Sequence, residues 1–148
     1  MKAIDDITSE VIDASIRIHR ELGPGLLESV YEIVLAGALA RCGLRVDRQK
    51  PIDIRFEGLH FPAAFRIDLL IEECPILEIK SVEELSNAHG KQLLTYLRLT
   101  NQPVGLLLNF SRATMKEGIR RVVNDYHQPH DSSAPPRLRV NQKRRELT

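Results

Sequence analysis

The chain is 148 residues long, 43% hydrophobic and 28% charged, with a formal net charge of +1, which predicts one globular domain with a sizeable core. No apolar run approaches the roughly 20 residues of a membrane span, the N-terminus lacks a secretory signal pattern, and the two cysteines, Cys42 and Cys74, suggest no disulfide framework. We therefore expect a cytoplasmic protein rather than a membrane-spanning, secreted or disulfide-stabilised one, while the near-neutral charge argues against a broad phosphate-binding surface.

Two helices are expected at the start of the chain. From about Asp5 to Leu22, apolar residues recur at helical spacing. Gly23-Pro24-Gly25 then ends this helix, because proline disfavours a helical residue before it. A second helix is predicted from about Leu26 to Arg41, where apolar residues again form one stripe, and Gly43 ends it.

Three strands, joined by short turns, are expected next. The first runs from about Arg45 to Phe56 and contains Pro51, which suggests an edge position or a bulge. The second runs from about Ala63 to Glu72 and is expected to alternate strictly, with one face formed by Phe65, Ile67, Leu69 and Ile71. The third covers Ile76 to Lys80, and the tight turns predict an antiparallel meander.

A further helix, a buried strand and a last helix complete the predicted domain. They cover about Asn87 to Leu99, Val104 to Phe110, and Lys116 to Tyr126. The order ααβββαβα predicts an α+β fold, in which a central mixed four-stranded sheet carries helices on both faces. Residues 127–148 combine three prolines with many charges and no periodic apolar face. We therefore expect a domain of residues 1–126 followed by a disordered basic tail of residues 127–148.

Charged residues stand inside two of the predicted strands. Glu78 and Lys80 interrupt an apolar run and share one strand face, because successive side chains alternate. Asp68 lies in the preceding strand, where cross-strand neighbours come within about 5 Å of each other. Two carboxylates that close repel each other unless a cation lies between them, which predicts a Mg²⁺ or Mn²⁺ site. The plainer alternatives are an aspartate paired with Arg66 and a strand-end lysine that reaches solvent.

The order of these elements and motifs resembles the PD-(D/E)xK nuclease superfamily. Within it, the closer resemblance is to the bacterial GxxExxY family, whose signature stands here as Gly25-Leu26-Leu27-Glu28-Ser29-Val30-Tyr31. Together with Asp68, Glu78-Ile79-Lys80 and Gln92-Leu93-Leu94-Thr95-Tyr96, this is also similar to the RecB-like motif set. The resemblance covers about Ile4 to Val123 and implies a restriction-endonuclease-like core.

The resemblance also implies an activity, namely metal-dependent hydrolysis of phosphodiester bonds by a metal-activated water. The expected metal ligands are Asp68, Glu78, the main-chain carbonyl of Ile79, and Glu28, the last directly or through water. The implied catalytic residues are Glu28, Asp68, Glu78, Lys80, Gln92 and Tyr96. Substrate contacts are expected from Arg66, Lys80 and Gln92. Glu28 has a plainer explanation as well, since acidic residues stabilise helix N-termini, and Tyr31 is expected to pack beside the site.

The expected partner is nucleic acid, with DNA as the first expectation. The alternative function is a catalytically silent nuclease-fold module that binds nucleic acid or a protein partner. The near-neutral charge favours this alternative, whereas the intact Asp, Glu and Lys argue against it. A chain of this size would need a second copy to hold both strands of a duplex, so a homodimer is a further expectation.

Overall fold

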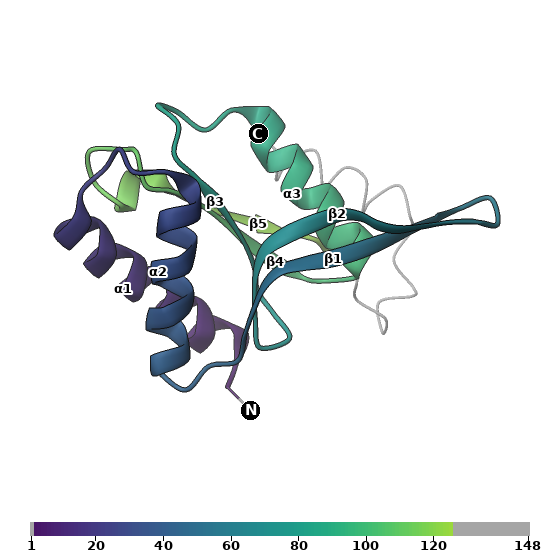
Figure 1. Ribbon diagram of the computed structural model, residues 1–148, viewed down its shortest axis with the longest axis horizontal. Coiled ribbons are helices and arrows are strands. Elements are labelled where there is room, and N and C mark those ends of the chain that lie inside the picture. Colours follow the sequence, from purple (N-terminus) through teal and green to yellow (C-terminus); the bar gives the residue numbers. More distant parts are fainter. Residues whose placement is uncertain (1, 126–148) are drawn as a thin grey trace.

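In the computed structural model, residues 2–125 are described, and they form one sheet with α1 and α2 on one face and α3 on the other (Figure 1). The expected tail, residues 127–148, lies outside the described residues. No helix within 2–125 has both the length and the apolar character needed to cross a membrane. The elements are α1 (Ile4–Leu22), α2 (Glu28–Arg41), β1 (Val46–Phe56), β2 (Leu59–Ile71), β3 (Ile76–Lys80), α3 (Asn87–Thr100), β4 (Val104–Asn109), the 3-10 turn η1 (Lys116–Gly118) and β5 (Ile119–Val123).

The sheet has five strands in the order β1-β2-β3-β4-β5. The first three form the predicted antiparallel meander, β3 and β4 run parallel, and β5 is antiparallel to β4. The parallel step requires a crossover connection, which α3 supplies. The structure therefore confirms an α+β fold with a mixed sheet, although its last element differs from the prediction.

That last element is a strand, so the helix predicted around Lys116 to Tyr126 is wrong. Only one 3-10 turn forms before β5 pairs with β4. Because β4 is buried along its whole length, its outer backbone groups need hydrogen-bond partners, which a strand supplies and a helix does not. Ile119, Val122 and Val123 fit a helical stripe, but β-branched residues also suit a pleated surface. The order is thus ααβββαββ, with a sheet of five strands rather than four.

β2 also departs from the strict alternation expected of it. Leu69 and Ile71 pack in the core beneath α1 and α2, whereas Ile67 packs with Leu70 in the core beneath α3. The change of face falls at Asp68. On β1, the neighbouring residue Gln49 has a φ of 51° and lies unpaired between two paired residues. The register is the same on both sides of this gap, so no residue is inserted, and the left-handed backbone conformation of Gln49 accompanies the change of face.

Beyond the core, β1 and β2 continue as a long two-stranded arm that projects from the body of the protein (Figure 1). β2 starts at Leu59, four residues before its predicted start at Ala63. The turn residues Glu57 and Gly58 have φ values of 49° and 78°, as a two-residue hairpin with a type I′ turn requires. All residues in the range 55–64 are exposed, so this part of the hairpin contributes nothing to the core.

Candidate active site

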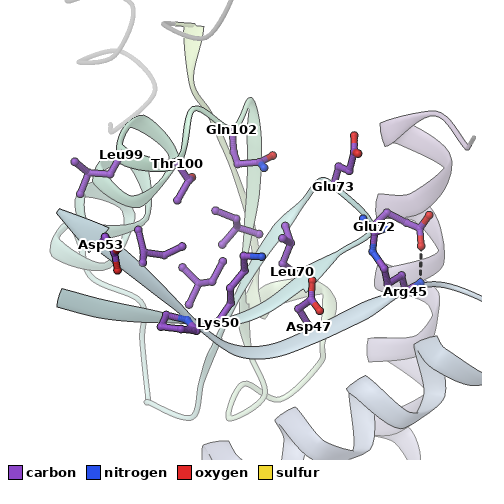
Figure 2. Close-up of a pocket in the computed structure, with 14 residues that line it drawn as sticks. Arg45, Asp47, Lys50, Asp53, Leu70, Glu72, Glu73, Leu99, Thr100 and Gln102 are labelled. Carbon is purple, nitrogen blue, oxygen red and sulfur yellow. Dashed lines mark hydrogen bonds between the residues drawn. The ribbon is translucent and has the colours of Figure 1, made fainter. Parts of the chain in front are cut away.

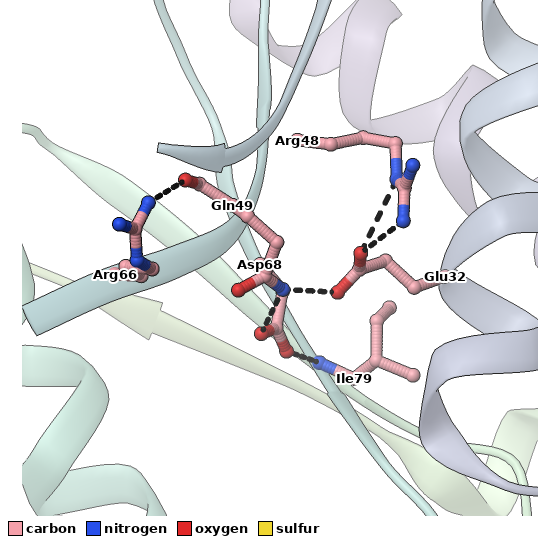
Figure 3. A network of polar contacts seen from close by, with 6 residues as sticks. All are labelled: Glu32, Arg48, Gln49, Arg66, Asp68 and Ile79. Carbon is pink, nitrogen blue, oxygen red and sulfur yellow. Dashed lines mark hydrogen bonds and ion pairs between the residues drawn. The ribbon is translucent and has the colours of Figure 1, made fainter. Parts of the chain in front are cut away.

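Asp68 and Glu78 come together where β2 and β3 separate. The ladder between these strands ends at the pair Leu69–Leu77, so Asp68 and Glu78 are the next residues on each side. Instead of a strand-to-strand bond, the backbone N–H of Ile79 donates to Oδ2 of Asp68 at 2.8 Å (Figure 3). This bond fixes the Asp68 carboxylate against the backbone of β3, immediately after Glu78.

Glu78 has the most unusual environment of any carboxylate in the site. It is only 5% exposed, and its Oε1 is buried without a hydrogen-bond partner among the described residues. Burial in the first place, and then the charge of Asp68, raise its pKa to about 9, although the ammonium of Lys80 acts in the opposite direction. At neutral pH the carboxyl therefore holds a proton, unless a cation replaces it.

This arrangement fits a divalent cation that prefers oxygen ligands. A buried oxygen without a partner, beside a second carboxylate, is the environment that such an ion completes. Within residues 2–125, no three His, Cys, Asp or Glu side chains converge as ligands. An ion at Asp68 and Glu78 would therefore take its remaining ligands from the main chain or from water, and Mg²⁺ usually keeps several waters.

Lys80 ends β3 on the same face as Glu78 and is partly exposed. Its position opposite Asn109 places it at the edge where β3 and β4 both end. The pKa of Glu78 is lowered by Lys80, although less than burial and Asp68 raise it, so the ammonium lies close enough to act on that carboxyl. A cation here would also act on a phosphate held at the carboxylate pair.

Glu28 lies in the first turn of α2 at the rim of this region. Its Oε2 accepts a hydrogen bond from the backbone N–H of Ser81 at 3.1 Å, and Ser81 Oγ donates to the carbonyl of Leu26 at 2.8 Å. These two bonds join the N-terminus of α2 to the residue that follows Lys80. The carboxylate faces an open hollow of about 690 Å³ that Ser81 and Ser111 also line.

Tyr31 holds the loop that precedes α2. Its ring is fully buried and stacks on Phe110 with a centroid distance of 4.4 Å. The hydroxyl donates to the carbonyl of Gly23 and accepts from the N–H of Leu26. Tyr31 therefore fixes the loop that carries Glu28, which agrees with its expected packing role.

Gln92 and Tyr96 belong to α3, which covers the face of the sheet that carries Glu78. Tyr96 stacks on Phe65 with a centroid distance of 4.3 Å. Burial and the charges of Glu78 and Asp68 raise the pKa of its hydroxyl, so α3 brings this side chain to the carboxylate pair. Gln92, one turn earlier, is exposed to solvent.

A polar network that the sequence analysis missed reaches Asp68 from α2 (Figure 3). Glu32 is 5% exposed and accepts a hydrogen bond from Gln49 Nε2 at 2.7 Å. The same nitrogen donates to Oδ1 of Asp68 at 3.3 Å, and Arg48 forms an ion pair with Glu32 at 3.0 Å. Arg66 donates to the main-chain carbonyl of Gln49 rather than to Asp68. The signal in the sequence that could have revealed this network is Glu32, a charged residue among the buried positions of α2.

A groove of about 800 Å³ lies elsewhere, between β1 and the C-terminal end of α3 (Figure 2). Apolar side chains such as Leu70 form part of its lining, with Lys50, Asp53 and Glu72 among its charged residues. None of Asp68, Glu78 and Lys80 lines it. Cavity size therefore does not locate the candidate active site of this protein, whereas the carboxylate pair does.

Comparison with known protein families gives a match to the PD-(D/E)XK nuclease superfamily over residues 5–122. Comparisons with curated proteins and with solved structures give no match. The matched range extends from α1 into β5 and includes all the candidate residues described above. The chain therefore belongs to the PD-(D/E)XK nuclease superfamily.

Proposed function

We propose that the protein is a nuclease of the GxxExxY type, which uses Mg²⁺ or Mn²⁺ to hydrolyse phosphodiester bonds of nucleic acid, with DNA as the expected substrate. The observation that carries this proposal is the buried, unpartnered oxygen of Glu78 beside Asp68. Such a carboxyl destabilises the protein unless a proton or a cation accompanies it. Strongly shifted pKa values of this kind gather at functional sites.

The residues that would hold the ion are Asp68, Glu78 and the carbonyl of Ile79. Glu28 would act from the rim, through water, because its carboxylate is bound to the backbone of Ser81. When bound, the ion would polarise the scissile phosphate and lower the pKa of a water.

Side chains of the protein would position the water and bind the substrate. Lys80 would orient the attacking water and offset negative charge on the phosphate, because it shares a strand face with Glu78. Gln92, exposed on α3, would contact the substrate, and Tyr96 would form one wall of the site. Arg66 would bind a phosphate next to the cleaved one, since its guanidinium is exposed near Gln49.

Glu32, Gln49 and Arg48 would act as positioning residues. Their chain of hydrogen bonds ends on Asp68, opposite the bond from Ile79, so the Asp68 carboxylate is held from two sides. Partners of this kind orient metal ligands and raise metal affinity in other proteins. For cleavage of a duplex we expect a homodimer, since one chain presents one such site.

The test is cleavage of labelled DNA and RNA by purified protein with Mg²⁺ or Mn²⁺. Asp68→Ala, Glu78→Ala and Lys80→Ala are each expected to abolish cleavage while the circular dichroism spectrum stays unchanged. Lys91→Ala, on an exposed position of α3, is the control and should cleave normally. Full activity in any of the three site variants would exclude this mechanism.

The same variants separate the nuclease from the catalytically silent module. A triple alanine variant that binds nucleic acid in EDTA as well as the wild type does, combined with a wild type that cleaves nothing, would support the module. Loss of cleavage together with retained binding would support the nuclease.

A further inference from the structure

The arm, defined here as residues 50–66, begins beside the candidate active site. Its first ladder pair, Pro51–Arg66, lies two residues from Asp68, and the ladder continues to the turn at Glu57. Only the base of the arm packs on the core beneath α3, through Ile52 and Phe65. The outer part is surrounded by solvent and projects away from the body (Figure 1).

One face of the outer arm is apolar and exposed. Cross-strand partners lie on the same face of a ladder, and here Ile54 pairs with Phe61 and Phe56 with Leu59. Because alternate residues share a face, all four belong to one surface. The exposed fractions are 61% for Phe56, 58% for Leu59 and 46% for Phe61. Exposed apolar patches of this kind mark binding surfaces.

That apolar face continues toward the catalytic carboxylates. The ladder shifts register between Ile52 and Ile54, and the additional residues lie on β2, between Phe65 and Phe61. On β1 both isoleucines are half-buried, with the exposed Asp53 between them, so they share a face. Ile52 packs on the α3 side of the sheet, which is the side of Glu78. Three of the four phenylalanines of the chain, Phe56, Phe61 and Phe65, belong to the arm. The innermost of them, Phe65, stacks on Tyr96 at the site.

The arm is also the basic part of an otherwise acidic body. Residues 50–66 contain three basic and two acidic residues, whereas the rest of 2–125 contains thirteen basic and sixteen acidic residues. The arm therefore carries +1 and the remainder −3. Within 2–125, neither Lys50 nor Arg66 forms an ion pair. A polyanion is thus attracted to the arm more than to other surfaces.

We propose that the aromatic face of the arm stacks against unpaired bases of a single-stranded nucleic acid whose backbone passes Lys50, which lies on the same face as Ile52 and Phe65, on its way to the carboxylate pair. This inference rests on the proposed function and names its substrate class. Stacking on aromatic side chains needs base faces that a duplex hides, and it combines with basic flanks in proteins that bind single strands. An apolar protein partner would gain nothing from Lys50 on that face.

The reach of the arm sets a substrate length. Phe61 is seven residues from Asp68 along β2, which corresponds to at most about 23 Å at roughly 3.3 Å per residue. Stacked bases rise by about 3.4 Å each, so a strand of at most about seven nucleotides would reach from the scissile phosphate to Phe61. Shorter oligonucleotides would occupy the site without touching the outer arm.

The test measures binding of labelled 20-mers by fluorescence anisotropy in EDTA, so that affinity is obtained without cleavage. The probes are (dT)20, (U)20 and a 20-base-pair DNA duplex. The wild type should bind a single strand more tightly than the duplex. The double variant F56L/F61L, which stays apolar but lacks the rings, should bind single strands about tenfold more weakly. The matched variant F56Y/F61Y keeps the rings and should bind as the wild type does.

Three results would overturn the inference: a preference for the duplex, equal affinities of F56L/F61L and the wild type, or a wild-type dimer that Leu59→Glu converts to a monomer, since the face would then join two copies. With metal present, F56L/F61L should lose cleavage efficiency on a 20-mer but not on a 4-mer. If no substrate is cut while the binding results hold, the nuclease proposal fails and the arm proposal stands.

Discussion

At the scale of single residues, Glu78 makes the stability of the metal-free protein depend on pH. Its pKa is raised to about 9 from 4.5, so over this range the folded protein keeps a proton that the unfolded chain releases. Stability from this group is fully present below pH 4.5 and is lost as pH rises toward 9. The site is therefore least stable, without metal, under the conditions in which both carboxylates are needed as ligands.

Glu78→Gln should remove this dependence, because an amide has nearly the same shape and no proton to lose. In EDTA at pH 8.5, we expect the variant to melt at least about 3 °C higher than the wild type, which corresponds to roughly 1 kcal/mol. At pH 5, where the carboxyl is neutral, the two should melt together. Thermal unfolding followed by circular dichroism checks this, with the exposed Glu84→Gln as control. A difference that is the same at both pH values would contradict the explanation.

Glu32 should matter for metal affinity although it touches no substrate. Glu32→Gln weakens the ion pair with Arg48 and changes the partner of Gln49, which holds Asp68. Loss of such a positioning partner typically lowers metal affinity about 10–100-fold. Calorimetric titration of Mn²⁺ into the wild type, Glu32→Gln and the exposed Glu21→Gln tests this. Unchanged affinity in Glu32→Gln would reduce the network to a structural role.

At the scale of elements, the close contact between Gly118 and β4 explains why β5 follows directly after η1. A Cβ at Gly118 would lie 2.0 Å from the carbonyl oxygen of Asn109. Because this oxygen belongs to the backbone of β4, it cannot move aside to relieve the clash. Gly118→Ala should therefore destabilise the protein by about 2–3 kcal/mol, or prevent it from folding. Gly37→Ala is the matched control, because nothing lies within 4 Å of a Cβ there, and in helix α2 it should stabilise by about 0.5–1 kcal/mol. Urea denaturation measures the stability of both variants. Equal unfolding midpoints for Gly118→Ala and Gly37→Ala would contradict the close contact at Gly118.

Features of the structure could be predicted where a local sequence pattern alone determines them. They could not be predicted where a tertiary neighbour determines them. Glu78 and Lys80 stand out because charges interrupt an apolar strand, a signal that needs no tertiary information. The five residues of β5 fit a helical and a strand pattern equally, and only the unpaired edge of β4 selects the strand. The Glu32–Gln49–Asp68 network escaped prediction because it depends on the left-handed backbone conformation of Gln49 in β1 and on the placement of α2 beside it.

At the scale of the whole molecule, the fold and the arm are separable. Both cores are formed by α1, α2, α3 and the inner parts of the strands, while all residues in 55–64 are exposed. Stability should therefore come from the body and substrate contact from the arm. The outer arm has no buried residue, and exposed apolar hairpins promote aggregation, so a binding role would give its apolar face a use.

A shortened arm tests this separation. Ile54 and Phe61 are ladder partners, so replacing residues 55–60 by Asn-Gly closes the hairpin with a turn of the same type. The melting temperature should stay within about 2 °C of the wild type, because no buried apolar surface is lost. Affinity for (dT)20 should fall, although less far than in F56L/F61L because the ring of Phe61 remains, while cleavage of a 4-mer should persist. A large loss of stability would show that the outer arm supports the fold, and the separation would then be wrong.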